Sequence, residues 1–249
     1  MQNTNGERQV KFREREFRGS RFRCLLATSL PQPKFVEWIN SVIRPFAEIS
    51  ERDIRMPKGF CSPEEARLGE TSKFLDAEKR KILTDWWLAV PESANTPNWD
   101  LVSTCNVDGR DGLILLEAKA HNGELKPDDC CGAKEPRNRE QIYQAVEEAS
   151  KALGTGWSLK ADHCYQLSNR FAWAWKAASL GVPVVLVYLG FLNAVEMPQP
   201  FQDHADWERR LHEYADGSMP RNVWNSRVTI GGTPLIPLIR STDVNVLAS

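Results

Sequence analysis

Two carboxylates and one ammonium group stand in or beside strand-like sequence near the middle of the 249-residue chain. Asp100 follows a tryptophan, and Glu117 and Lys119 end an apolar run that begins at Leu113. Because successive side chains of a strand point to opposite faces, Glu117 and Lys119 lie on the same face. Charges at the end of a buried strand are costly unless they are paired or bound to a metal ion. These three residues are therefore the first candidates for chemistry.

Two acids and a lysine that converge suit metal-assisted hydrolysis of phosphodiester bonds. Mg²⁺ takes one or two carboxylates as ligands, with water and substrate phosphate in the remaining positions. Asp100 and Glu117 would hold the ion, which polarises a phosphoryl oxygen and lowers the pKa of a bound water. Lys119 would hold the attacking water or neutralise charge that develops on the phosphate. The alternative is an ordinary solvent-facing pair, which the preceding run argues against, because it is apolar on both faces and indicates a doubly covered strand.

The segment between the two acids predicts a β-hairpin. It contains the pairs Asp108-Gly109 and Asp111-Gly112. Asp-Gly is typical of tight hairpin turns, because Gly adopts positive φ without steric cost. Such a hairpin would bring the strand that follows Asp100 beside the strand that carries Glu117.

These residues resemble the PD-(D/E)xK nuclease superfamily, which has the restriction-endonuclease-like fold. Asp100 matches the first acid, and Glu117-Ala118-Lys119 matches the second half of the motif. Trp99 stands where the name-giving proline would be, a departure that is common in the superfamily. The resemblance implies an α/β protein with a mixed central sheet flanked by helices, in which a meander carries the acids, a helix crosses over and a further strand returns parallel. It also implies metal binding by Asp100, Glu117 and the backbone of Ala118, with Mg²⁺ as the ion and Mn²⁺ as a substitute.

Downstream sequence agrees with this arrangement. Apolar residues spaced by three and four predict a helix over 165–180, and the β-branched run over 182–190 is typical of a buried parallel strand. The opposite helix face carries Gln166 and Arg170, with His163 just before them. Many members of the superfamily place a Gln or a basic residue here, so Gln166 is expected to be catalytic, and Arg170 and His163 to bind substrate. A solvated helix face is the alternative.

Two further positions complete the candidate set. The superfamily often adds an acid from its first core helix, for which Glu70 and Glu78 are the candidates and Glu70 is favoured. His121 follows Lys119 by two residues and is expected to reach phosphate, unless the strand simply frays into a polar loop there. A helix predicted over 141–153 makes this region an insertion, and insertions beside a site often shape substrate access.

Length and composition favour one large core with elaborations. We expect a nuclease domain over 60–249, preceded by a basic segment and an accessory helix over 1–59. The net charge of −1 gives no general attraction for nucleic acid. Within 7–23, however, seven basic residues face three acidic ones, and such a segment is able to lie along a phosphate backbone or to remain solvated.

Several classes are disfavoured. The six cysteines contain no Cys-x-x-Cys pair, which argues against zinc and iron–sulfur sites. The first apolar run is short and follows dense charge, unlike a signal peptide, and no segment is long enough to span a membrane. A cytoplasmic location without a membrane partner is therefore expected.

The sequence thus predicts a metal-dependent nuclease, with DNA as the expected substrate and endonucleolytic cleavage as the expected mode. One alternative is a catalytically silent nucleic-acid-binding or assembly module of the same fold, and another is an unrelated α/β enzyme. Retention of Asp100, Glu117 and Lys119 together argues against the silent module. The lack of a Gly-rich phosphate loop and of a Gly-x-Ser-x-Gly elbow argues against common α/β enzymes. RNA as the substrate, sequence specificity and the oligomeric state, a homodimer included, are left open.

Overall fold

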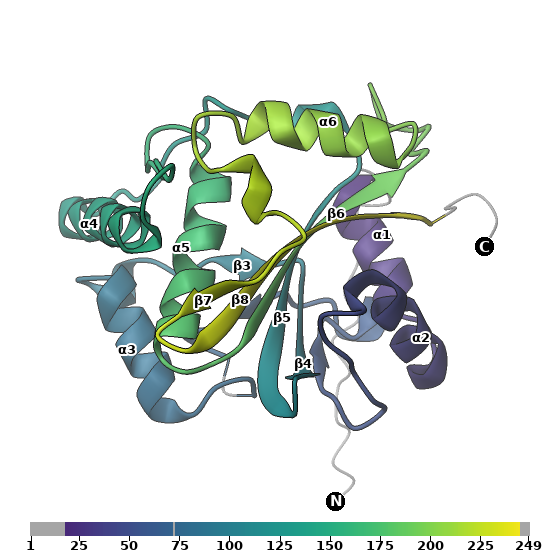
Figure 1. Ribbon diagram of the computed structural model, residues 1–249, viewed down its shortest axis with the longest axis horizontal. Coiled ribbons are helices and arrows are strands. Elements are labelled where there is room, and N and C mark those ends of the chain that lie inside the picture. The colour runs from purple at the N-terminus through teal and green to yellow at the C-terminus, as the bar shows by residue number, and fades with distance from the viewer. Residues whose placement is uncertain (1–17, 72, 245–249) are drawn as a thin grey trace, which may run out of the picture.

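Helices cover both faces of a central sheet in the computed structural model, which describes residues 18–71 and 73–244 (Figure 1). The α-helices of these residues are α1 (Gly19–Thr28), α2 (Gln32–Ile43), α3 (Ala77–Trp87), α4 (Pro136–Leu153), α5 (Tyr165–Ser179) and α6 (His204–Tyr214). The strands are β1 (Arg55–Met56), β2 (Ala66–Arg67), β3 (Asn98–Trp99), β4 (Leu101–Val107), β5 (Arg110–Lys119), β6 (Val184–Leu192), β7 (Val228–Ile230) and β8 (Thr233–Asp243). Short 3₁₀ turns occur at η2 (Gly59–Cys61), η3 (Pro91–Ser93), η4 (Asn122–Glu124) and η5 (Arg221–Val223).

The central sheet has six strands in the order β1-β4-β5-β6-β8-β7. β5, β6 and β8 are parallel to one another, whereas β1, β4 and β7 run antiparallel to their neighbours. β2 and β3 form a separate two-stranded sheet. The expected α/β class with a mixed central sheet flanked by helices is therefore confirmed.

The predicted hairpin joins β4 to β5. Val107 pairs with Arg110, which leaves Asp108 and Gly109 as a two-residue turn with φ angles of 52° and 81°. Positive φ at both central residues is typical of a type I′ turn, whose twist matches that of the flanking strands. The register places Leu101 opposite Leu116, so Asp100 lies just before the end of the ladder that carries Glu117.

β5 is covered on both faces, as its apolar run predicts. Leu113 and Leu115 pack into a core with α3, α4, α5 and α6. Ile114 and Leu116 pack into a second core with α1 and α2, on the other side of the sheet (Figure 1). The parallel partner β6 follows α5, so the predicted helix and the predicted buried strand are both present.

The described part of the N-terminal region packs against one face of the sheet through α1 and α2 and adds β1 to its edge. The inserted helix α4 begins at Pro136, five residues before the predicted start, because proline supplies a favourable first helical residue. Within the described residues, no helix is both long and apolar enough to cross a membrane.

Candidate active site

Glu117 and Lys119 form the centre of a buried charged cluster at the end of β5. Their exposed fractions are only 2% and 5%. The Lys119 ammonium donates to Glu117 Oε1 at 2.5 Å and to Gln166 Oε1 at 2.7 Å. The Arg170 Nε donates to Glu117 Oε2 at 2.7 Å. The structure therefore brings together four of the predicted residues, two from β5 and two from α5.

Both cations control the ionisation of Glu117. Burial alone would raise the pKa of its carboxyl group, but the charges and hydrogen bonds of Arg170 and Lys119 outweigh burial and lower that pKa below its usual range. Burial would likewise lower the pKa of Lys119, but Glu117 and then Asp100 raise it. All three groups of the cluster are therefore charged at neutral pH. Arg170 is held further by the face of Trp99, 4.6 Å from its guanidinium carbon.

The start of α5 is positioned by a residue from a distant loop. Asp129 accepts hydrogen bonds from the amides of Tyr165 and Gln166, at 2.6 and 3.0 Å. These amides belong to the first helical turn and have no partner within the helix. Cys164, just before the helix, has a left-handed conformation with φ of 45°. Asp129 thus fixes the end of α5 from which Gln166 reaches Lys119.

Asp100 lies between β3 and β4, next to this cluster but in a different depression. Its Oδ2 accepts a hydrogen bond of 2.7 Å from the amide of Ala118, the residue between Glu117 and Lys119. Burial, followed by repulsion from Glu117, raises the pKa of Asp100 to about 8. Its carboxylate lines a narrow recess against α1, which we call the Asp100 recess and which is lined also by Arg21, Cys24, Leu25, Pro57, Pro63 and Glu65.

Asp100 and Glu117 differ in their fit to a divalent cation. Asp100 is held by a neutral amide and repelled by Glu117, so a cation beside both groups would relieve burial and repulsion together. Both oxygens of Glu117 already accept hydrogen bonds, so binding through Glu117 requires exchange of one of them. Among residues 18–71 and 73–244, no cluster of three or more His, Cys, Asp or Glu side chains is arranged to hold a metal ion. Two carboxylates nevertheless match what Mg²⁺ takes from proteins.

A cleft of about 890 Å³ opens beside the charged cluster. His121, expected to reach phosphate, lies on its wall, and its Nδ1 accepts a hydrogen bond of 3.2 Å from the amide of Gly123. The residues that line this cleft include Arg67, Asn98, Lys119, His121, Gln166 and Arg170.

Two predicted residues lie away from this cluster. Glu70 is not helical, and its carboxylate accepts from the amide of Thr96 at 2.9 Å and from Arg67 at 3.1 Å, so it braces a loop. The helix nearby begins only at Ala77, and Glu78 in its first turn is exposed. Neither Glu70 nor Glu78 therefore adds a helical acid to the charged cluster.

His163 lies away from the cluster as well, so its predicted position is wrong. It is exposed and lines a different surface depression, together with Tyr143 and Glu147 of α4. Its predicted position assumed that helical periodicity extended back from Gln166. The left-handed Cys164 breaks that periodicity, so His163 points elsewhere.

Two further acids lie beside the site: Glu65, which the sequence did not indicate, and Glu124, which lies five residues after Lys119 in the sequence. Glu65 lines the Asp100 recess and contributes to the raised pKa of Asp100, while its Oε1 lies 3.4 Å from Arg21 Nε. Glu124 binds the amide of Ala120 and the hydroxyl of Ser20, and so ties the end of β5 to α1. Glu65 stands in neither a motif nor a periodic pattern, so no local signal could have revealed it.

Comparisons of the chain with protein-family models, curated proteins and solved structures gave no match. The function must therefore follow from the chemistry of the site. The site places cations where negative charge could develop, next to two carboxylates and an open cleft. This arrangement suits the binding and activation of a phosphate ester.

Proposed function

We propose that this protein is a metal-dependent nuclease of restriction-endonuclease-like fold that hydrolyses phosphodiester bonds, with DNA as the expected substrate. The observation that carries the proposal is the buried cluster of Glu117, Lys119 and Arg170 beside the Asp100 carboxylate. A fold needs no such cluster for stability, because apolar residues of similar volume commonly serve as well as buried ion pairs. Its position at the edge of an open cleft favours a chemical role.

The topology supports the finer fold assignment. An antiparallel pair, β4 and β5, carries the acids, α5 crosses over, and β6 returns parallel to β5. This is the order of elements that the resemblance to the PD-(D/E)xK superfamily implies. The candidate acids also stand where that order would place them, at the ends of neighbouring strands.

Each polar residue of the site has a distinct proposed role. Asp100, Glu117 and the backbone of Ala118 would hold Mg²⁺ or Mn²⁺, which when bound supplies an electrophile for the phosphoryl oxygen and a more acidic water. Lys119 neutralises charge that develops on the phosphate or orients the attacking water. Gln166 fixes the direction of the Lys119 ammonium through its 2.7 Å hydrogen bond.

Arg170 and His121 complete the proposed substrate site. The Arg170 guanidinium has five N–H donors and gives only two of them to Glu117 and Asn169, so the others are available to contact phosphate. The bond to Asn169 runs from Nη1 to Oδ1 at 2.8 Å. His121 adds a second polar group on the cleft wall.

A second candidate function is a catalytically silent nucleic-acid-binding module of the same fold. It is favoured by one observation, namely that both carboxylate oxygens of Glu117 are bound by cations of the protein itself. In such a module the cluster would only present Lys119 and Arg170 to phosphate. Binding without cleavage would distinguish this candidate from the nuclease.

The test uses purified protein with labelled single- and double-stranded DNA and RNA, in Mg²⁺, Mn²⁺ or EDTA. Cleavage is expected with either ion and not with EDTA, and Glu117→Gln should abolish it. Asp111→Asn is the matched control, because Asp111 lies exposed on the same strand. Cleavage that persists in EDTA or in Glu117→Gln would contradict the proposal, and tight binding without any cleavage would favour the silent module.

A further inference from the structure

The cleft has a cationic side, on which Glu117 pairs with two of the three cations. Lys119, Lys126 and Arg170 line it. Its two lining carboxylates are already engaged by main-chain amides: Glu124 binds the amide of Ala120 at 2.5 Å, and Asp129 binds the first amides of α5. This side is therefore suited to an anionic ligand such as phosphate.

The lining of the cleft also has an apolar part, which we call its apolar side. Its lining includes Ala94, Ala133, Ile142 and the half-buried ring of Tyr165. Ala133 and Ile142 belong to the insertion between β5 and α5. A surface of this kind is suited to the face of a planar apolar group, and nucleic-acid bases are such groups.

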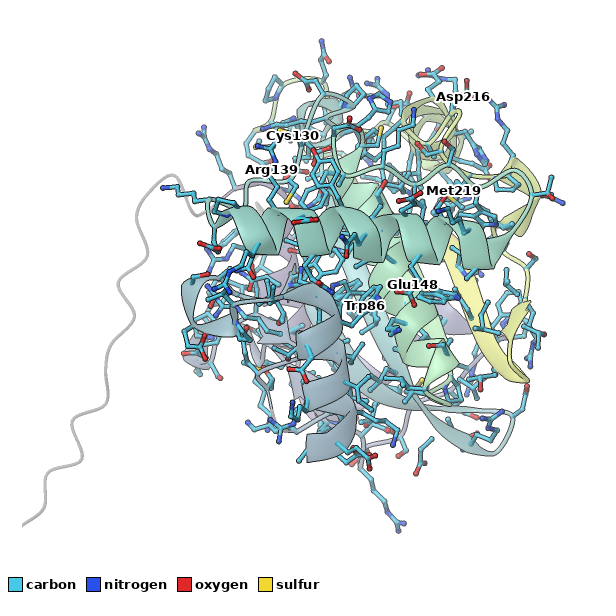
Figure 2. All side chains as sticks on the ribbon, turned by 90° about the vertical axis from the view of Figure 1, so that its left-hand side faces the viewer. Trp86, Cys130, Arg139, Glu148, Asp216 and Met219 are labelled. Atoms are coloured by element: carbon cyan, nitrogen blue, oxygen red, sulfur yellow. The ribbon has the colours of Figure 1, made fainter. Side chains whose placement is uncertain are left out.

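The helix α4, which carries Ile142 of the apolar side, is held in place by hydrogen bonds to α3. α4 lies across α3, with Trp86 and Glu148 between them (Figure 2). Trp86 Nε1 donates to Glu148 Oε2 at 2.8 Å, and Gln141 donates to the carbonyl of Trp86, also at 2.8 Å. These bonds hold Ile142, the neighbour of Gln141, in place on the wall of the cleft.

The size of the cleft limits its ligand. Pockets of roughly 300–1,000 Å³ enclose single small-molecule ligands. At about 890 Å³, the cleft has room for one or two nucleotides. The insertion that carries α4 supplies the wall that narrows it.

We propose that the cleft binds an unpaired nucleotide, with its phosphate on the cationic side and its base on the apolar side. The substrate is then a single strand or the unpaired end of a duplex. This inference rests on the proposed function, because Lys119 serves both. It goes further by naming the form of nucleic acid that is bound.

Gly132 offers a direct way to block the base side. It lines the cleft, a Cβ atom built there meets no atom within 4 Å, and its φ is outside the left-handed region. Gly132→Trp therefore adds a large ring at the wall of the cleft without backbone strain. Ala152→Trp is the matched control, because it adds the same ring at an exposed position of α4 away from the cleft.

Lys126 offers an independent test of the phosphate side. Its side chain is exposed, so Lys126→Ala leaves the fold intact. Loss of one phosphate contact should weaken single-strand binding and reduce the slope of log affinity against log salt by about 0.7. This variant keeps the proposal testable if Gly132→Trp does not fold.

The experiment measures binding by fluorescence anisotropy in EDTA, with an unpaired oligothymidine and a blunt hairpin duplex, and cleavage of both in Mg²⁺ and Mn²⁺. The single strand is expected to bind at least about tenfold more tightly than the duplex, a difference that base stacking of ~1–3 kcal/mol supplies. Gly132→Trp should lose this preference, and Ala152→Trp should keep it.

Equal or tighter binding of the duplex would overturn the inference, as would unchanged single-strand affinity in both Gly132→Trp and Lys126→Ala. Duplex cleavage that Gly132→Trp leaves unaffected would overturn it while the nuclease assignment stands. Single-strand binding that Gly132→Trp abolishes, without cleavage of either probe, would support the inference while the nuclease assignment fails.

Discussion

Replacement of Asp100 by Asn should remove a pH-dependent loss of stability from the metal-free protein. The pKa of Asp100 is about 8 in the folded protein, whereas an aspartate of the unfolded chain has the ordinary value of 3.8. Between these values the folded protein keeps a proton that the unfolded chain releases, so the free energy of unfolding falls as the pH rises from about 4 to 8. One pKa unit corresponds to ~1.4 kcal/mol, so a rise from pH 5 to pH 8 should lower the free energy of unfolding by about 4 kcal/mol.

The assay is urea unfolding in EDTA at several values between pH 5 and pH 8. Asp100→Asn keeps an oxygen that accepts from the Ala118 amide but has no proton to release, so its stability should fall by about 4 kcal/mol less than that of the unaltered protein. Asp111→Asn, exposed on β5, should keep the full loss. Mg²⁺ at pH 8 should restore stability to the unaltered protein and to Asp111→Asn, but not to Asp100→Asn. Equal pH dependence in Asp100→Asn and the unaltered protein would refute the burial and repulsion argument.

Three further predictions concern the cluster, a cap and a close contact. Lys119→Ala should lower the single-turnover cleavage rate at least on the order of 100-fold while it weakens DNA affinity far less, and Lys119→Arg should not restore the rate; a normal rate with weakened, salt-sensitive affinity would make Lys119 a simple phosphate contact. Asp129→Ala removes the acceptor of two amides at the start of α5 and should lower the free energy of unfolding by about 0.5–2 kcal/mol, measured by urea titration; an unchanged midpoint would contradict the capping role. Gly190→Ala places a Cβ atom 2.6 Å from the ring of Trp207 and should cost about 1–3 kcal/mol in the same assay, whereas Gly132→Ala, with open space around it, should change stability by less than about 0.5 kcal/mol; equal effects would contradict the packing argument.

The parts of the fold that follow from local patterns could be predicted from the sequence. Asp108-Gly109 specifies its turn because both residues tolerate positive φ. The apolar run before Glu117 and the periodic stripe of α5 specify a doubly covered strand and a helix that packs on it. These signals are sufficient to bring Glu117, Lys119, Gln166 and Arg170 into one cluster once the crossover is assumed.

The parts that depend on distant contacts could not be predicted. Asp129 caps a helix that begins 36 residues later along the chain, and Glu65 approaches Asp100 only because β2 pairs with β3. The left-handed Cys164 ends helical periodicity without a glycine or proline to announce it, and so displaces His163. Such features arise from packing between segments, which a one-dimensional pattern does not encode.

The bond between Arg170 and Glu117 also has a consequence for the order of events during synthesis. The two residues are separated by 53 positions, and the parallel partner β6 lies farther along still. At ~5–20 residues per second, Glu117 is made roughly 3–10 seconds before the guanidinium that neutralises it. During that interval β5 has its antiparallel neighbour β4 but lacks the strand and helix that cover it, and exposed apolar strands of this kind are prone to aggregate. We therefore expect nascent chains that end before α5 to depend on chaperones, and slower translation of 120–170 to lower the yield of native protein.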